Sequence, residues 1–177
     1  MDVGFVILCP DRKIGGLKNT IGSIKSNAYE RDFICVVGNN VFSDELKEMK
    51  KCAPTFTGSN TITSLINTGI KECNHEWAFL IFSGSRACPY IENRFFTWVK
   101  KETDVLFPVV DRKRDFVSGS FNGVLINTKF FAEVGDFPNY TMENTGMNDF
   151  ELSKLLWATD AIEKGVTFKA IVGMKII

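Results

Sequence analysis

Three short polar turns in this sequence carry the side chains best suited to chemistry, and each turn follows an apolar run of strand length. They are Pro10-Asp11-Arg12, Asn39-Asn40 and Ser83-Gly84-Ser85. Their carboxylate, guanidinium, amide and hydroxyl groups suit a ligand that is rich in oxygen atoms. Serine hydroxyls alone would hold Mg²⁺ or Mn²⁺ weakly, because these cations usually need one or two carboxylates.

The elements that would position these turns alternate between strands and helices. Apolar runs predict strands over 3–9, 33–37, 77–82, 105–110, 121–126 and 166–172. Because helical spacing follows each of the first three strands, we expect an α/β domain with a mostly parallel central sheet and helices on both faces. Ligands of such sheets bind beyond the carboxyl ends of the strands, where the three turns lie.

Two local features refine the second half of the chain. Pro108 cannot donate a backbone hydrogen bond, so it predicts that the strand over 105–110 lies at a sheet edge or bends. Thr128 is expected to cap a short helix that ends at Gly135.

Composition excludes several classes of protein. The 177 residues suffice for one domain, and 21 basic residues balance 21 acidic ones, so no net field favours nucleic acid. The 5 cysteines include no Cys-x-x-Cys pair, and with a single histidine they argue against a zinc site. We read no signal peptide and no run of membrane-spanning length, and we expect reduced thiols and a cytoplasmic protein.

Aromatic content suggests an interface. The chain has 16 phenylalanines and 3 tryptophans, which a small domain has difficulty burying completely. We therefore expect a homo-oligomer, with contributions from Phe95, Phe96 and Trp98 on one helix and Phe130 and Phe131 on another.

Five segments are informative as a set: FVILCPDRK, FICVVGNNVFSDEL, SLINTGIKECNHEWAFLIFSGS, GSFNGVLINTKFFAEVGDFP and MNDFELSKLLW. In this order they resemble segments of the family-2-like glycosyltransferases of the GT-A fold, over nearly the whole chain. The resemblance implies one GT-A-like domain over 1–177. Its nucleotide-sugar-binding half would span 1–110, and the half with the acceptor site and catalytic base would span 111–177.

The resemblance also implies an activity. A sugar would move from a nucleotide-diphosphate donor, a UDP-sugar, to a hydroxyl of a saccharide or protein acceptor with inversion. Asp149 would be the general base, a task that a carboxylate can perform. Together with the ligand rule for parallel sheets, the resemblance predicts a donor site lined by Pro10, Asp11, Arg12, Asn39, Thr61, Ser83 and Ser85.

The sequence departs from the family's pattern in two places. Gly38 stands where the family has an aspartate that recognises uracil, and the amide of Asn39 would replace it. The turn Ser83-Gly84-Ser85 stands in place of the acids that hold the metal ion. A divalent cation, Mn²⁺ or Mg²⁺, would then bind mainly through the donor diphosphate. More of the leaving-group charge would fall on cationic side chains, namely Arg12, Arg86 and the run from Arg112 to Arg114.

Alternative interpretations of these residues and of the fold stay open. Asp149 stands at a helix start, where an acid commonly serves as a cap. The missing acids favour a catalytically idle module that binds nucleotides or partners. Gly15-Gly16 with Lys13 and Lys18 is a faint version of the loop after the first strand of a nucleotidyltransferase.

Overall fold

The computed structural model describes residues 2–10, 14–27, 33–38, 43–59, 61–87, 91–109, 115–117, 120–139 and 149–172. In chain order its elements are β1 (Val3–Cys9), α1 (Ile14–Asn27), β2 (Phe33–Val37), α2 (Ser43–Cys52), β3 (Thr55–Thr57), α3 (Ile62–Lys71), β4 (Trp77–Phe82), α4 (Ile91–Trp98), β5 (Asp104–Pro108), β6 (Val124–Asn127), α5 (Thr128–Val134), α6 (Asp149–Glu163) and β7 (Thr167–Ile171).

Within the described residues the strands form one 7-stranded sheet in the order β3-β2-β1-β4-β6-β5-β7. β6 pairs antiparallel with both of its neighbours, and every other pair is parallel. This confirms the predicted mostly parallel α/β sheet. Since β1 and β4 are adjacent and parallel, with Leu8 opposite Phe82, their carboxyl ends and the turns after them meet at one edge.

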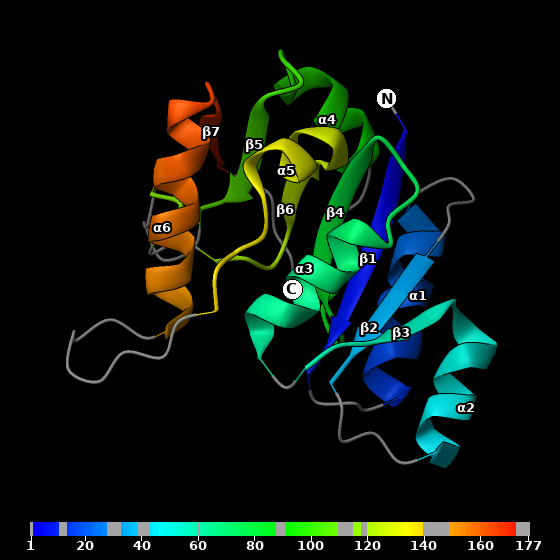
Figure 1. Ribbon diagram of the computed structural model, residues 1–177. Helices are drawn as coiled ribbons and strands as arrows, with labels where there is room; N and C mark the ends of the chain where they lie inside the picture. The colour runs from blue at the N-terminus through cyan, green and yellow to red at the C-terminus, as the bar shows by residue number, and fades with distance from the viewer. Residues whose placement is uncertain are drawn as a thin grey trace.

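Helices cover both faces of the sheet, as predicted. Alternate residues of the fully buried strand β1 point to opposite faces. Val3, Phe5 and Ile7 join a core with α1 and α4, while Val6 and Leu8 join a second core with α3, α5 and α6. Figure 1 shows α3 and α5 in front of the sheet and α1 behind it.

The second core is rich in aromatic rings. Phe116 packs against Phe107, Phe121, Trp157 and Phe168 with ring centroids 4.5–6.1 Å apart. The indole of Trp157 donates a hydrogen bond to the carbonyl of Gly135 at 2.8 Å, which ties α6 to the end of α5. The domain therefore absorbs many of its rings in its own core.

The proposed interface residues need a correction. Phe95, Phe130 and Phe131 are 0%, 9% and 2% exposed, so they belong to the core and offer no surface to a second chain. The side chain of Phe96 lies outside the described residues. The described large apolar side chains that are exposed are Leu155 and Ile162 on α6 and Val172 after β7.

Several boundaries differ from the sequence prediction. The short strand β3, which pairs with β2 at the sheet edge, was not predicted. β5 lies between β6 and β7, so Pro108 does not mark an edge strand; it is the last residue of β5, where a missing N–H costs little. Asn127 caps α5 in place of Thr128, because its side chain accepts the N–H of Phe130 at 3.0 Å.

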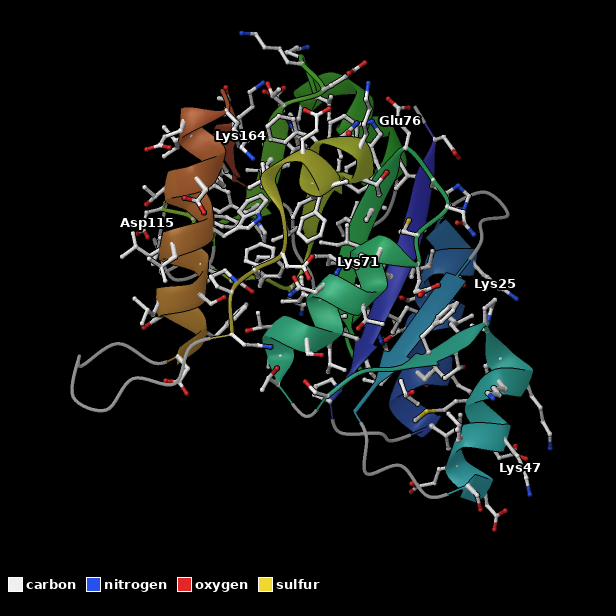
Figure 2. All side chains as sticks on the ribbon, in the orientation of Figure 1. Lys25, Lys47, Lys71, Glu76, Asp115 and Lys164 are labelled. Atoms are coloured by element: carbon white, nitrogen blue, oxygen red, sulfur yellow. The ribbon has the colours of Figure 1, made fainter. Side chains whose placement is uncertain are left out.

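Two chemical expectations can be compared with the described residues. Cys52 and Cys73 are free thiols, and burial raises the pKa of the Cys73 thiol. Among the helices described, none is both long enough and apolar enough to cross a bilayer. Lys25 and Lys47 project outward from α1 and α2 (Figure 2).

Candidate functional site

The turn that follows β4 lies against the end of β1. The N–H of Ser83 donates to the carbonyl of Leu8 at 2.7 Å, and the N–H of Ser85 donates back to Phe82 at 3.1 Å. Gly84 has a φ of 90°, a conformation that favours glycine. The turn therefore sits at the carboxyl edge of the parallel strands, where the sequence placed it.

Hydrogen bonds from helix α1 fix the position of this turn. The N–H of Gly84 donates to the carbonyl of Gly16 at 3.2 Å and to Thr20 Oγ1 at 3.0 Å. The hydroxyl of Thr20, which is fully buried, donates in turn to the carbonyl of Ser85 at 2.8 Å. A Cβ atom on Gly16 would lie 2.7 Å from Ser83 Oγ, so glycine is required for this close approach. Sequence reasoning missed Thr20, which reads as an ordinary helix residue.

The two serines of the turn have different surroundings. Ser83 Oγ is buried and has no hydrogen-bond partner among the described residues, because it packs toward Gly16. Ser85 Oγ, on a half-buried residue, accepts a hydrogen bond from Asn122 Nδ2 at 2.8 Å. The hydroxyl of Ser85 is therefore the better placed of the two for a ligand.

Asn122 joins the turn to β6. Its Oδ1 accepts the N–H of Phe82 at 2.9 Å, and its own N–H donates to Ser120 Oγ at 3.1 Å. The side chain thus adds one hydrogen bond beyond the last ladder pair, Leu80 with Val124. The sequence prediction placed Asn122 inside a strand over 121–126. The signal that identifies it is the Asn122-Gly123 dipeptide, a common turn former, and Gly123 has a φ of 101°.

The first turn of α6 approaches the same edge. Asp149 is the first residue of this helix and is exposed. The ring of Phe150 packs edge-on against Phe121, with centroids 5.5 Å apart, and Phe121 directly precedes Asn122. The start of α6 is therefore linked to the turn by two contacts: Phe150, next to Asp149, packs on Phe121, and Asn122, next to Phe121, donates to Ser85. On the same helix, the buried Lys154 places its Nζ 5.0 Å from the Phe150 ring.

Thr61 marks the amino end of α3 at this edge. Its side chain caps the helix by accepting the N–H of Ser64 at 3.1 Å, and it donates to Asn139 Oδ1 at 3.2 Å. Two further hydrogen bonds, of 2.9 and 3.0 Å, join the Asn67 side chain to the backbone of Phe137. The segment that leads toward α6 is thereby fixed to α3.

The structure places the predicted residues as follows. Pro10 is exposed directly after β1, while Asp11, Arg12 and Asn39 lie outside the described residues, as do Lys13 and the run from Arg112 to Arg114. Arg86 follows the turn and is exposed. The structure thus brings Pro10, Ser83, Ser85 and the start of α6 to one edge. The interactions of the donor with all of the predicted site residues stay predictions.

The chemistry of the turn decides how a divalent cation would fit. Within the described ranges, no group of three or more His, Cys, Asp or Glu side chains is arranged to hold a metal ion. Ser83, Gly84 and Ser85 offer neutral oxygens and no carboxylate. These residues fit Mn²⁺ or Mg²⁺ only where a ligand brings the anionic oxygens with it.

Comparison with known proteins identifies the fold. No family model and no curated protein match the sequence. A mannosyltransferase from Pyrobaculum calidifontis, in complex with GDP-Man and Mn²⁺, superposes with a TM-score of 0.70 and 11% identity over 99% of this chain. The TarS protein of S. aureus gives a TM-score of 0.65 at 9% identity, and a structure of its residues 1–349 gives 0.64 at 8%, each over 99% of this chain.

These likenesses are to longer proteins. The chain spans 56% of the mannosyltransferase, 36% of TarS and 59% of the shorter TarS structure. At identities this low they establish the fold, which is the GT-A-like fold of glycosyltransferases.

Proposed function

We propose that this GT-A-like domain transfers a sugar from a nucleoside-diphosphate donor to an acceptor hydroxyl with inversion. The observation that carries the proposal is the hydroxyl-bearing turn at the carboxyl end of β4. Hydrogen bonds to α1 and Asn122 fix that turn, and the start of α6 lies nearby. In parallel sheets this edge is where ligands bind. The 1–110 half would hold the donor, and the 111–177 half would hold the acceptor and base.

The reaction requires two catalytic contributions from the protein, stabilisation of the leaving group and removal of a proton from the acceptor. As the glycosidic bond to the diphosphate breaks, negative charge grows on the leaving phosphate, and cations or oriented donors must stabilise it. Arg86 and the Ser85 hydroxyl are the described groups for this role, and Arg12 would add to them. The acceptor hydroxyl must lose a proton on the other face of the sugar, and Asp149 is the base we assign.

The donor we favour is a UDP-sugar, as the sequence resemblance implies. The mannosyltransferase complex contains GDP-Man and Mn²⁺, so GDP-mannose is the first competitor to test. Any divalent cation would sit between diphosphate oxygens and neutral groups of the turn, and it would help to neutralise the leaving group.

The decisive experiment is calorimetric titration with UDP-, GDP- and other nucleotide sugars, with and without Mn²⁺, followed by a transfer assay. We expect a nucleotide sugar to bind and little Mn²⁺ to bind without it. Ser85→Asp should raise Mn²⁺ affinity more than Ser83→Asp, because Ser83 faces Gly16. Absence of binding by every nucleotide sugar would overturn the proposal.

A second candidate is a catalytically idle module that binds nucleotides or partner proteins. The neutral, internally hydrogen-bonded turn favours it, since no described carboxylate replaces the expected acids. This candidate predicts nucleotide binding without transfer to any acceptor. A nucleotidyltransferase is less favoured, because Gly16 packs against Ser83 and Gly84 and so already has a structural use.

Self-association and a cytoplasmic location stay predictions. The described apolar surface that would serve an interface lies on α6 and after β7, at Leu155, Ile162 and Val172. Light scattering over a wide concentration range tests the association, and a monomer mass throughout would refute it.

A further inference from the structure

Hydrogen bonds on both sides fix the orientation of the Asn122 carboxamide relative to Ser85. One end of its carboxamide faces the N–H of Phe82, a donor, at 2.9 Å, so that end must be the oxygen. The other end, at 2.8 Å from Ser85 Oγ, must therefore be the NH₂ group, which only donates. The backbone of β4 thus sets the orientation of the amide.

This orientation fixes the polarity of the Ser85 hydroxyl. A hydroxyl has one proton to donate and can accept two hydrogen bonds. Because Asn122 Nδ2 occupies an accepting position, the proton of Ser85 must point away from Asn122. The carbonyl of Ser85 is held separately by Thr20, at 2.8 Å. The residue is therefore anchored at its backbone and at one side of its oxygen.

We propose that Asn122 is a positioning residue that makes Ser85 Oγ a hydrogen-bond donor to a phosphate oxygen of the donor nucleotide. This inference rests on the proposed function and specifies how a turn without acids recognises an anionic ligand. A metal-binding acid would present negative charge at this position, whereas the Asn122–Ser85 pair presents a proton. The pair is itself neutral, so it needs no counter-ion when the ligand is absent.

The test reverses the polarity with an isosteric change. Asn122→Asp keeps an oxygen for the N–H of Phe82 and places a second oxygen opposite Ser85 Oγ. In that variant the Ser85 proton turns toward the introduced carboxylate and is lost to the ligand. UDP and GDP are the probes, titrated by calorimetry into the unmodified protein, Asn122→Asp, Ser85→Ala and the double variant.

We expect Ser85→Ala to weaken binding of the preferred nucleotide about tenfold, the scale of one hydrogen bond to a charged group. Asn122→Asp should weaken binding at least as much, through the lost proton and the added negative charge. In the Ser85→Ala background only the charge effect remains, so the two losses should not multiply. Ser85→Thr, which keeps the hydroxyl, should retain most of the affinity.

Controls separate position from charge and from folding. Asn127→Asp makes the same substitution at the other end of β6, where the side chain caps α5, and should leave nucleotide binding unchanged. Melting temperatures show whether each variant is folded. If Asn122→Asp does not fold, Asn122→Ala supplies the cycle, with a smaller loss that disappears in the Ser85→Ala background.

The outcomes are distinct. Equal effects of Asn122→Asp with and without the Ser85 hydroxyl would overturn this inference and leave the proposed function standing. An unmodified protein that binds neither UDP nor GDP would overturn this inference, and if the nucleotide sugars also fail to bind, the proposed function falls with it.

Discussion

The two edges of the sheet use polar groups in different ways. At the amino edge, Asp104 is 1% exposed and pairs with Lys169, and Asp2 Oδ1 lies 2.8 Å from His75 Nδ1. At the carboxyl edge, the described contacts that hold the β4 turn are all neutral hydrogen bonds, and the charged residues Arg86 and Asp149 are exposed. The described charges at the first edge are paired within the protein, and those beside the β4 turn and at the start of α6 are exposed.

The largest effect should follow from breaking the amino-edge pair. Asp104 accepts hydrogen bonds from the amides of Lys100 and Lys101 as well as from Lys169. Asp104→Ala leaves these donors unpaired beside a buried site, so we expect a loss of about 3–5 kcal/mol in the free energy of unfolding. Urea denaturation measures it. Asp136→Ala breaks the exposed pair with Lys71 and should cost less than about 1 kcal/mol. Similar losses for both would remove the contrast.

The same carboxylate should make stability depend on pH. Burial raises the pKa of Asp104, but the hydrogen bond from Lys169 and those from two amides outweigh it, so the pKa is lowered overall. Its contribution is then complete above the pKa of an unfolded aspartate, about 3.9, and is lost as pH falls through the folded value. The stability difference between the unmodified protein and Asp104→Asn should be constant from pH 7 to pH 5 and shrink below pH 4. A difference that grows on acidification would contradict this.

At the carboxyl edge the expected effect is on chemistry instead of stability. Asp149→Asn removes a base and keeps a side chain that can cap α6. Sugar transfer should fall about a hundredfold or more, with nucleotide affinity and melting temperature almost unchanged. Glu151→Gln, in the same helical turn, is the matched control. Transfer by Asp149→Asn at the parent rate would reduce Asp149 to a helix cap.

The strands and the side-chain contacts differ in how far they could be predicted from sequence. The strands over 3–9, 33–37 and 77–82 were predicted with the boundaries that the structure has, because buried parallel strands are continuous apolar runs. β3 was not, because three residues, Thr-Phe-Thr, form a strand only through their pairing with β2. The turn after β4 follows directly from its strand, so its location at the carboxyl edge could be predicted.

Side-chain roles at that edge could not be predicted in the same way. Ser83 and Ser85 are chemically identical in sequence, and only the approach of Gly16 separates a buried hydroxyl from one that meets Asn122. Asn122 and Thr20 both hydrogen-bond to Ser85, which lies 37 and 65 positions away from them in the chain. Contacts of this range are set by topology, which local patterns do not contain.

A smaller effect should come from adding one methyl group to α1. Gly16→Ala places a Cβ 2.7 Å from Ser83 Oγ and 3.2 Å from the Gly84 nitrogen. Overpacking of this kind costs about 1–3 kcal/mol of stability, and the displaced turn should bind nucleotide more weakly. Gly22→Ala, where a Cβ meets nothing within 4 Å, should instead stabilise the helix by up to about 1 kcal/mol. Equal responses at the two glycines, measured by thermal unfolding, would show that the turn is not packed as described.

The smallest effect is expected at Ser83, and its sign is informative. Ser83 Oγ is buried without a hydrogen-bond partner among the described residues, so Ser83→Ala removes a desolvated polar group and leaves no donor behind. The free energy of unfolding should stay constant or rise by about 1 kcal/mol or less, and nucleotide affinity should hardly change. Ser83→Ala should also relieve much of the cost of Gly16→Ala, since the closest contact disappears. Ser85→Ala, by contrast, should weaken nucleotide binding with little effect on stability. If both serine variants weaken binding equally, the Ser83 side chain must turn outward when the ligand binds, and the distinction between the two hydroxyls would be wrong.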